Sequence, residues 1–123
     1  MTHYPNLLIR KSENHYDWYE VIRDCRFRDI VVKKGFETDF ASVPQVVWSI
    51  IPPHGRAAVP SVFHDWLYQR QHTHSYSRRE ADALWLAMML ERKVPTLQAY
   101  TMYYFVRWFG HGVWKKYAQK KSE

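Results

Sequence analysis

The sequence predicts an α+β fold, in which a small N-terminal antiparallel sheet of about three strands packs on about three C-terminal helices. Residues 1–40 contain short apolar or alternating runs typical of strands, whereas the chain beyond residue 60 has the periodicity of helices. The connector between them is extended and interrupted by prolines. Because 123 residues suffice for one modest core, we expect a single domain with a β-rich part (1–40) and a helical part (60–118).

Three strands are expected in the first part. Apolar runs at 7–10 and 18–23 are separated by a polar turn, and a third run follows at 30–32. Together they predict a three-stranded antiparallel meander. The segment Lys33-Lys34-Gly35 would close it, because Gly35 can adopt positive φ.

Three helices are expected in the second part. The first runs from Ser61 to about Gln71, with Pro60 at or just before its first turn. The second runs from Arg78 to about Lys93, and the segment Ser77-Arg78-Arg79-Glu80 that opens it fits a capping box. The third, from Leu97 to about Phe109, is apolar on most sides. Such a helix is either central or half of an interface.

Two ionisable side chains fall on apolar faces of the first two helices. His64 lies in the apolar run 60–68, and Asp82 lies inside the apolar arc of the next helix. A buried carboxylate is costly unless paired, so we expect Asp82 to bind either Arg78, one turn earlier, or His64. Pairing with His64 would fix the imidazole tautomer and leave the other ring nitrogen as a general base, with Tyr68 adding a hydrogen bond. A structural network that locks the helices together is the alternative.

Other polar side chains are candidates near the same place. Asp65 points about 100° away from His64 on a helix and either binds a hard cation or is an exposed helix residue. Asp39 and Ser42, in the connector, are typical turn or capping residues that could instead face the site. The candidate substrate-binding residues are Asp39, Ser42 and Arg78. A zinc site is less well supported, because the other histidines lack metal-ligand spacing to His64.

Composition limits the partners and the compartment. A net charge of +6 allows attraction to nucleic acid, anionic lipid or cell-wall polymers. The basic residues are scattered and no helix-turn-helix is evident, which disfavours nucleic acid. With Cys25 as the only cysteine, an intrachain disulfide and a thiolate zinc site are excluded. No signal peptide or membrane-length apolar run is evident, so we expect synthesis in a cytoplasm.

The sequence contains a set of short motifs that are specific when taken together. The motifs are Thr38–Pro44, Pro52-Pro53-x-Gly55-Arg56, His64–Tyr68, Ser77-Arg78-x-Glu80-Ala81-Asp82 and Tyr104-x-x-Arg107-x-Phe109-Gly110. As a set they resemble a family of small uncharacterised proteins of tailed bacteriophages and prophages, and the resemblance runs from about residue 34 to about residue 114. The resemblance implies a phage origin, with synthesis in the host cytoplasm. It leaves incorporation into the virion open, and the partners we expect are other virion or tail proteins.

The pattern His-Asp-x-x-Tyr, followed by Ala-Asp on the next helix, is similar to the active site of secreted and viral phospholipases A2. This resemblance implies that His64 activates water, that Asp65 binds calcium, and that Tyr68 and Asp82 orient the imidazole. The sequence departs from that family because no glycine-rich calcium loop precedes His64.

Two classes of function follow. The first is a hydrolase, associated with the virion or the host envelope, that acts on a lipid ester or a cell-wall polymer. An anionic membrane or such a polymer would then be a partner. The competing class is a non-enzymatic virion or tail-assembly protein, whose aromatic third helix and basic tail form the contact surface.

Overall fold

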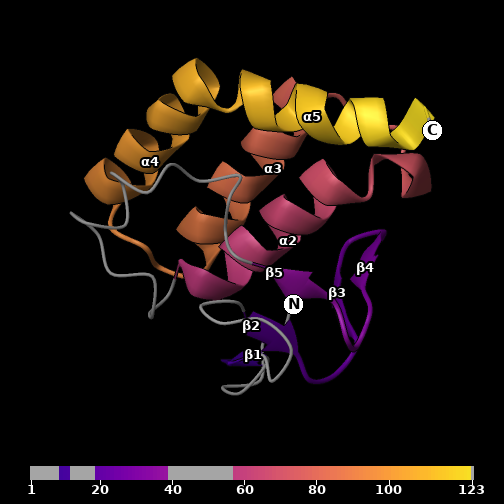
Figure 1. Cartoon of the computed structure of the whole chain (residues 1–123). Helices are drawn as coiled ribbons and strands as arrows, with labels where there is room; N and C mark the ends of the chain where they lie inside the picture. The colour runs from indigo at the N-terminus through magenta and orange to yellow at the C-terminus, as the bar shows by residue number, and fades with distance from the viewer. Residues whose placement is uncertain (1–8, 12–18, 39–56, 123) are drawn as a thin grey trace. The chain divides into compact units, whose positions relative to one another are not determined.

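The computed structural model describes residues 9–11, 19–38 and 57–122. The chain divides into two compact units, residues 1–40 and 41–123. The described strands all lie in the first unit and the described helices in the second, which confirms the α+β class (Figure 1). That the two units form a single domain stays a prediction.

The described residues of the first unit form five short strands. They are β1 (Ile9–Lys11), β2 (Tyr19–Val21), β3 (Cys25–Phe27), β4 (Ile30–Val32) and β5 (Glu37–Thr38). One antiparallel sheet has the order β1-β2-β5, and a second consists of β3 and β4. The small antiparallel sheet expected at the N-terminus is therefore divided into two.

The predicted three-stranded meander is wrong in its third strand. The pairing of the first two runs is confirmed by β1 and β2. The run at 30–32, however, pairs with 25–27 through a tight turn in which Arg28 has a φ of 56°. Such turns are usually signalled by Asn-Gly or Asp-Gly, and neither is present in this turn. The third place is taken by β5, which follows Gly35 at a φ of 93°, so the positive φ expected for Gly35 is confirmed.

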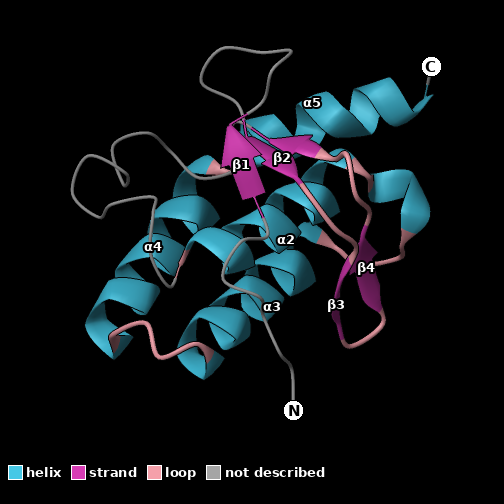
Figure 2. Ribbon diagram, turned by 90° about the horizontal axis from the view of Figure 1, so that it is seen from below, coloured by secondary structure: helices cyan, strands magenta, loops and turns pink. Residues whose placement is uncertain are grey.

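The described residues of the second unit form four α-helices and a short 3-10 helix. They are α2 (Ala58–Gln69), η1 (Gln71–Thr73), α3 (Arg78–Glu91), α4 (Thr96–Phe109) and α5 (His111–Ser122). The three predicted helices correspond to α2, α3 and α4. Within this unit, α3 packs against both α2 and α4, and Figure 2 shows the three lying side by side. The basic tail forms a separate helix, α5.

The start of α3 is fixed by the predicted capping box. The backbone N–H of Glu80 donates to the Ser77 hydroxyl at 3.1 Å, and the N–H of Ser77 donates to the Glu80 carboxylate at 2.9 Å. The bond from the Ser77 backbone also lowers the pKa of Glu80. Because the helix begins here, Arg78 falls in its first turn and Asp82 one turn later, on the same face.

The contact between α2 and α3 combines apolar packing with a satisfied polar pair. The indole N–H of Trp85 donates to the Ser61 hydroxyl at 3.1 Å, and that hydroxyl donates to the Ala57 carbonyl at 2.7 Å. The buried apolar side chains of the three packed helices include Phe63, Leu67, Ala81, Trp85, Met88, Met89, Ala99, Met102 and Val106. This core holds α2 and α3 in register one turn away from His64 and Asp82.

Helix α5 follows α4 after a bend and lies against the C-terminal end of α2 and against η1 (Figure 1). The Gln71 amide donates to the Trp114 carbonyl at 2.8 Å and to the Tyr68 carbonyl at 2.9 Å. The Trp114 ring meets the Tyr68 ring edge-on at 5.0 Å between centroids. The chain bends at Gly110 between α4 and α5, and the contacts of Trp114 place α5 over the side of α2 that carries Tyr68.

Candidate functional site

The carboxylate of Asp82 lies at the centre of a buried polar cluster. Its Oδ1 accepts hydrogen bonds from His64 Nε2 at 2.7 Å and from the Tyr68 hydroxyl at 2.8 Å. Its Oδ2 accepts from Arg107 Nη1 at 2.7 Å and, more weakly, from Arg78 Nη1 at 3.4 Å. Asp82 and His64 are both 0% exposed. The partners come from α2, α3 itself and α4, so the cluster exists only where these helices meet.

Asp82 is ionised in this environment. Burial alone would raise the pKa of Asp82, but the hydrogen bond and charge of His64, together with Arg107 and Tyr68, outweigh it and hold that pKa below its usual value. An ionised carboxylate can only accept hydrogen bonds, so His64 Nε2 must carry a hydrogen. In a neutral imidazole the lone pair then lies on Nδ1.

The His64 ring is held on two sides by other rings. The Tyr68 centroid lies 4.5 Å away and the Trp85 centroid 4.4 Å away, both tilted against the imidazole. Burial, followed by the charge of Asp82, raises the pKa of Tyr68 far above its usual value. The Tyr68 hydroxyl therefore stays protonated and donates to Asp82. Because the two neighbouring rings pack against it, the His64 imidazole has little freedom to rotate.

Arg78 and Arg107 tie the cluster to the end of α4. The guanidinium of Arg78 donates to the Val106 and Arg107 carbonyls, each at 3.1 Å, and so caps carbonyls in the last turn of α4. Arg107, in the same turn, reaches back to Asp82. Both candidate partners of Asp82, Arg78 and His64, therefore bind it at once. Substrate binding by Arg78 stays a prediction, and Asp39 and Ser42 lie outside the described residues.

Arg107 and Gly110 belong to the site, although neither was predicted from the sequence as a site residue. Arg107 is the only charged residue of α4, an otherwise apolar helix, and this was the available signal. A Cβ at Gly110 would lie 2.8 Å from the Tyr68 hydroxyl oxygen and 3.2 Å from Arg78 Nη1. Glycine at this position therefore leaves the space that Tyr68 and Arg78 occupy beside Asp82.

Asp65 is buried, so its interpretation as an exposed helix residue is wrong. Its Oδ2 accepts from the Gln69 amide of the same helix at 2.6 Å. In the described parts of the chain, no group of three or more His, Cys, Asp and Glu side chains is placed to hold a metal ion. Calcium takes about six to eight oxygen ligands, which these side chains do not supply. The calcium role of Asp65 stays a prediction.

The lowered pKa of Asp82 predicts how stability depends on pH. The unfolded carboxyl has a pKa of about 3.9. Ionised Asp82 therefore contributes stability above about pH 4, and this is lost as the pH falls through the lower folded pKa. Urea denaturation between pH 7 and pH 3 should show this loss in the wild type and a smaller loss in Asp82→Asn. Equal losses in both proteins would contradict the prediction.

Comparison with known proteins identifies a family. A family model described as a protein of unknown function (DUF1353) matches residues 17–106. The match includes His64, Tyr68, Arg78 and Asp82, and it ends immediately before Arg107. No curated protein and no solved structure matches the chain. Because the matched residues are well over half of the sequence, the chain belongs to the DUF1353 family of proteins of unknown function.

Proposed function

We propose that this chain is a phage- or prophage-encoded hydrolase in which His64 is the general base. The observation that carries the proposal is the pair of hydrogen bonds at Asp82 Oδ1, from His64 Nε2 at 2.7 Å and from the Tyr68 hydroxyl at 2.8 Å. They orient the imidazole and select the tautomer with its lone pair on Nδ1. The phage origin rests on the motif resemblance and is part of the proposal.

In the proposed reaction, Nδ1 of His64 accepts a proton from water while the water oxygen attacks the carbonyl carbon of an ester. The bond from that carbon to the leaving oxygen then breaks, and the leaving alcohol takes the proton from Nδ1. The products are a carboxylic acid and an alcohol. Asp82 stabilises the imidazolium that forms in between, and Tyr68 is a positioning residue that acts through Asp82.

The proposed substrates are esters of membrane lipids or of cell-wall polymers, met at the virion or the host envelope. The net charge of +6 supports anionic substrates of this kind, because it raises their local concentration at the protein surface. Virion or tail proteins are the proposed partners. Since His64 is fully buried, the reaction requires that the atoms covering the ring move aside when substrate binds.

The experiment compares wild type with His64→Asn and Tyr68→Phe, using His72→Ala, which changes an exposed histidine, as the control. Fatty-acid release from phospholipid vesicles and release of fragments from purified cell walls are measured, each with calcium and with a chelator. We expect turnover in wild type and in the control, none in His64→Asn, and a shifted pH profile in Tyr68→Phe. Equal rates in wild type and His64→Asn, or no turnover of either substrate, would refute the hydrolase.

A non-enzymatic virion or tail-assembly protein is the second candidate. The complete burial of His64 and Asp82, and the four donors around Asp82, favour this role because they are typical of a network that locks helices together. In that case the His64→Asn variant loses stability and the wild type hydrolyses neither substrate. The same protein would then be recovered bound to other structural proteins in a purified particle.

A further inference from the structure

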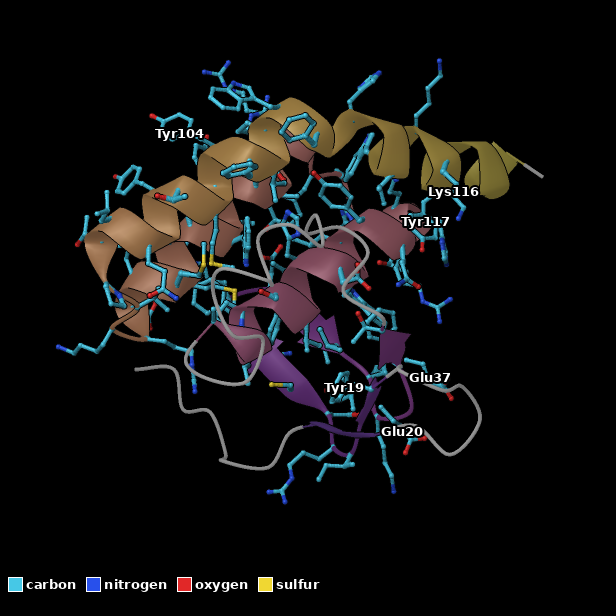
Figure 3. All side chains as sticks on the ribbon, turned by 60° about the vertical axis from the view of Figure 1, so that its left-hand side comes forward. Tyr19, Glu20, Glu37, Tyr104, Lys116 and Tyr117 are labelled. Carbon is cyan, nitrogen blue, oxygen red and sulfur yellow. The ribbon has the colours of Figure 1, made fainter. Side chains whose placement is uncertain are left out.

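Helix α4 is apolar on two opposite faces. Ala99, Met102 and Val106 are buried on the face that packs against α3. The other face carries an apolar stripe, defined by Leu97, Tyr100, Tyr104 and Trp108, whose members follow one another at intervals of three or four residues. Figure 3 shows Tyr104 on the outer side of α4.

The side chains of this apolar stripe are well exposed. Leu97 is 82% exposed, Trp108 71% and Tyr104 51%. In the described part of the chain, the other large exposed hydrophobic side chains are Leu90 and Phe109, and Phe109 also belongs to α4. Single exposed hydrophobic residues are ordinary, but a contiguous apolar patch on one helix marks an interaction site.

The charged side chains of α4 and α5 have one sign. Residues 96–122, which form α4 and α5, include no Asp or Glu. Arg107 is paired with Asp82, so the remaining positive charge of this segment belongs to four lysines of α5, at 115, 116, 120 and 121. Lys115 and Lys116 are exposed, and Lys116 Nζ lies 5.9 Å from the Tyr117 ring (Figure 3). Trp108, at the end of the stripe, is separated from α5 by two residues.

This combination fits an anionic lipid surface. Tyr and Trp side chains settle at the boundary between headgroups and acyl chains, and lysines are attracted to anionic headgroups. A second copy of the chain fits less well, because a symmetric contact through this face would bring two acid-free basic segments together. No helix in the described ranges is long and apolar enough to span a membrane.

We propose that α4 and α5 together bind the surface of an anionic lipid bilayer. The apolar stripe enters the headgroup region, and Lys115 and Lys116 contact the lipid phosphates. This binding does not depend on the hydrolase activity proposed above, because His64 lies in α2 and Asp82 in α3, and neither helix belongs to the proposed lipid-binding surface.

The test measures binding of the whole chain to vesicles by co-sedimentation, without turnover. Vesicles containing phosphatidylglycerol are compared with vesicles of phosphatidylcholine alone. Each lysine near an anionic surface contributes about fivefold to binding, so Lys115→Glu/Lys116→Glu should weaken it by about 25-fold or more. Trp108→Ala should weaken it by about tenfold. The matched control, Lys33→Glu/Lys34→Glu, makes the same charge change at exposed lysines of the first unit and should bind much more tightly than Lys115→Glu/Lys116→Glu.

Four outcomes would overturn the lipid-surface proposal. One is equal binding to both kinds of vesicle, and another is an equal loss in the matched control. The third is a stable dimer in light scattering that Trp108→Ala dissociates while vesicles remain unbound. Tighter binding to single-stranded DNA than to anionic vesicles would assign the same face to nucleic acid instead. Melting temperatures close to wild type verify that the surface variants are folded.

Discussion

Asp82→Asn is expected to lower the free energy of unfolding by about 3–5 kcal/mol, the range typical of removing one partner from a buried ion pair. An asparagine amide has one acceptor oxygen and an NH2 group that only donates. The asparagine NH2 group would then face another donor, either His64 Nε2 or Arg107 Nη1. Each of these nitrogens lies 2.7 Å from an oxygen of the present carboxylate. Arg107 would also lose the negative charge that offsets its partial burial. Urea denaturation at pH 7 measures the change.

The control for this variant is Asp24→Asn. Asp24 is an exposed carboxylate that accepts from the Lys34 backbone N–H at 2.8 Å and lies 3.8 Å from Lys33 Nζ. An exposed pair of this kind contributes about 0–1 kcal/mol, so its loss should be small. If Asp82→Asn costs no more than Asp24→Asn, the buried cluster does not stabilise the helical unit as described.

Gly110→Ala is expected to cost about 1–3 kcal/mol, the usual effect of overpacking a buried position. The Gly110 backbone has φ −78° and ψ −11°, which any residue adopts. The loss of stability therefore comes only from steric overlap of the added Cβ. The added Cβ would lie 2.7 Å from the Val106 carbonyl oxygen and 2.8 Å from the Tyr68 hydroxyl oxygen. Tyr68 is fully buried and bonded to Asp82, so it has little room to withdraw. Thermal or urea denaturation measures the loss.

Gly112→Ala is the matched control for this substitution. Gly112 lies in α5, and nothing lies within 4 Å of a Cβ built there. Alanine is favoured over glycine in a helix by about 1 kcal/mol, so this change should stabilise. Tyr68→Phe should also reduce the cost of Gly110→Ala, because it removes the oxygen that the Cβ meets. Destabilisation of equal size at both glycines would contradict the steric explanation.

Much of the site was predictable because its signals are local in sequence. His64 and Tyr68 are four residues apart, which places them on one helix face, and the capping box fixed the phase of the helix that carries Asp82. A carboxylate in an apolar arc requires partners, which predicted the contact between α2 and α3. The contact of Arg107 with Asp82 was not predicted. The two residues are 25 apart in sequence, and their contact depends on how α4 packs against α3.

The strand pairing and the burial of Asp65 were not predicted, for other physical reasons. The turn between β3 and β4 places Arg28 in the left-handed region, which its residue type does not favour and therefore does not signal. Asp65 lies at the border of the apolar arc, where periodicity alone does not decide between burial and exposure. The structure buries it.

The capping of α4 by Arg78 has a consequence for how the helical unit comes apart. Arg78 lies in the first turn of α3, and its guanidinium donates to carbonyls at the end of α4. Arg78 and Arg107 also both donate to the Asp82 carboxylate, which binds His64 and Tyr68 of α2. Detaching any one of these helices would break hydrogen bonds to the buried Asp82 carboxylate. Because the three helices share this one cluster, we expect them to open together as a cooperative folding unit.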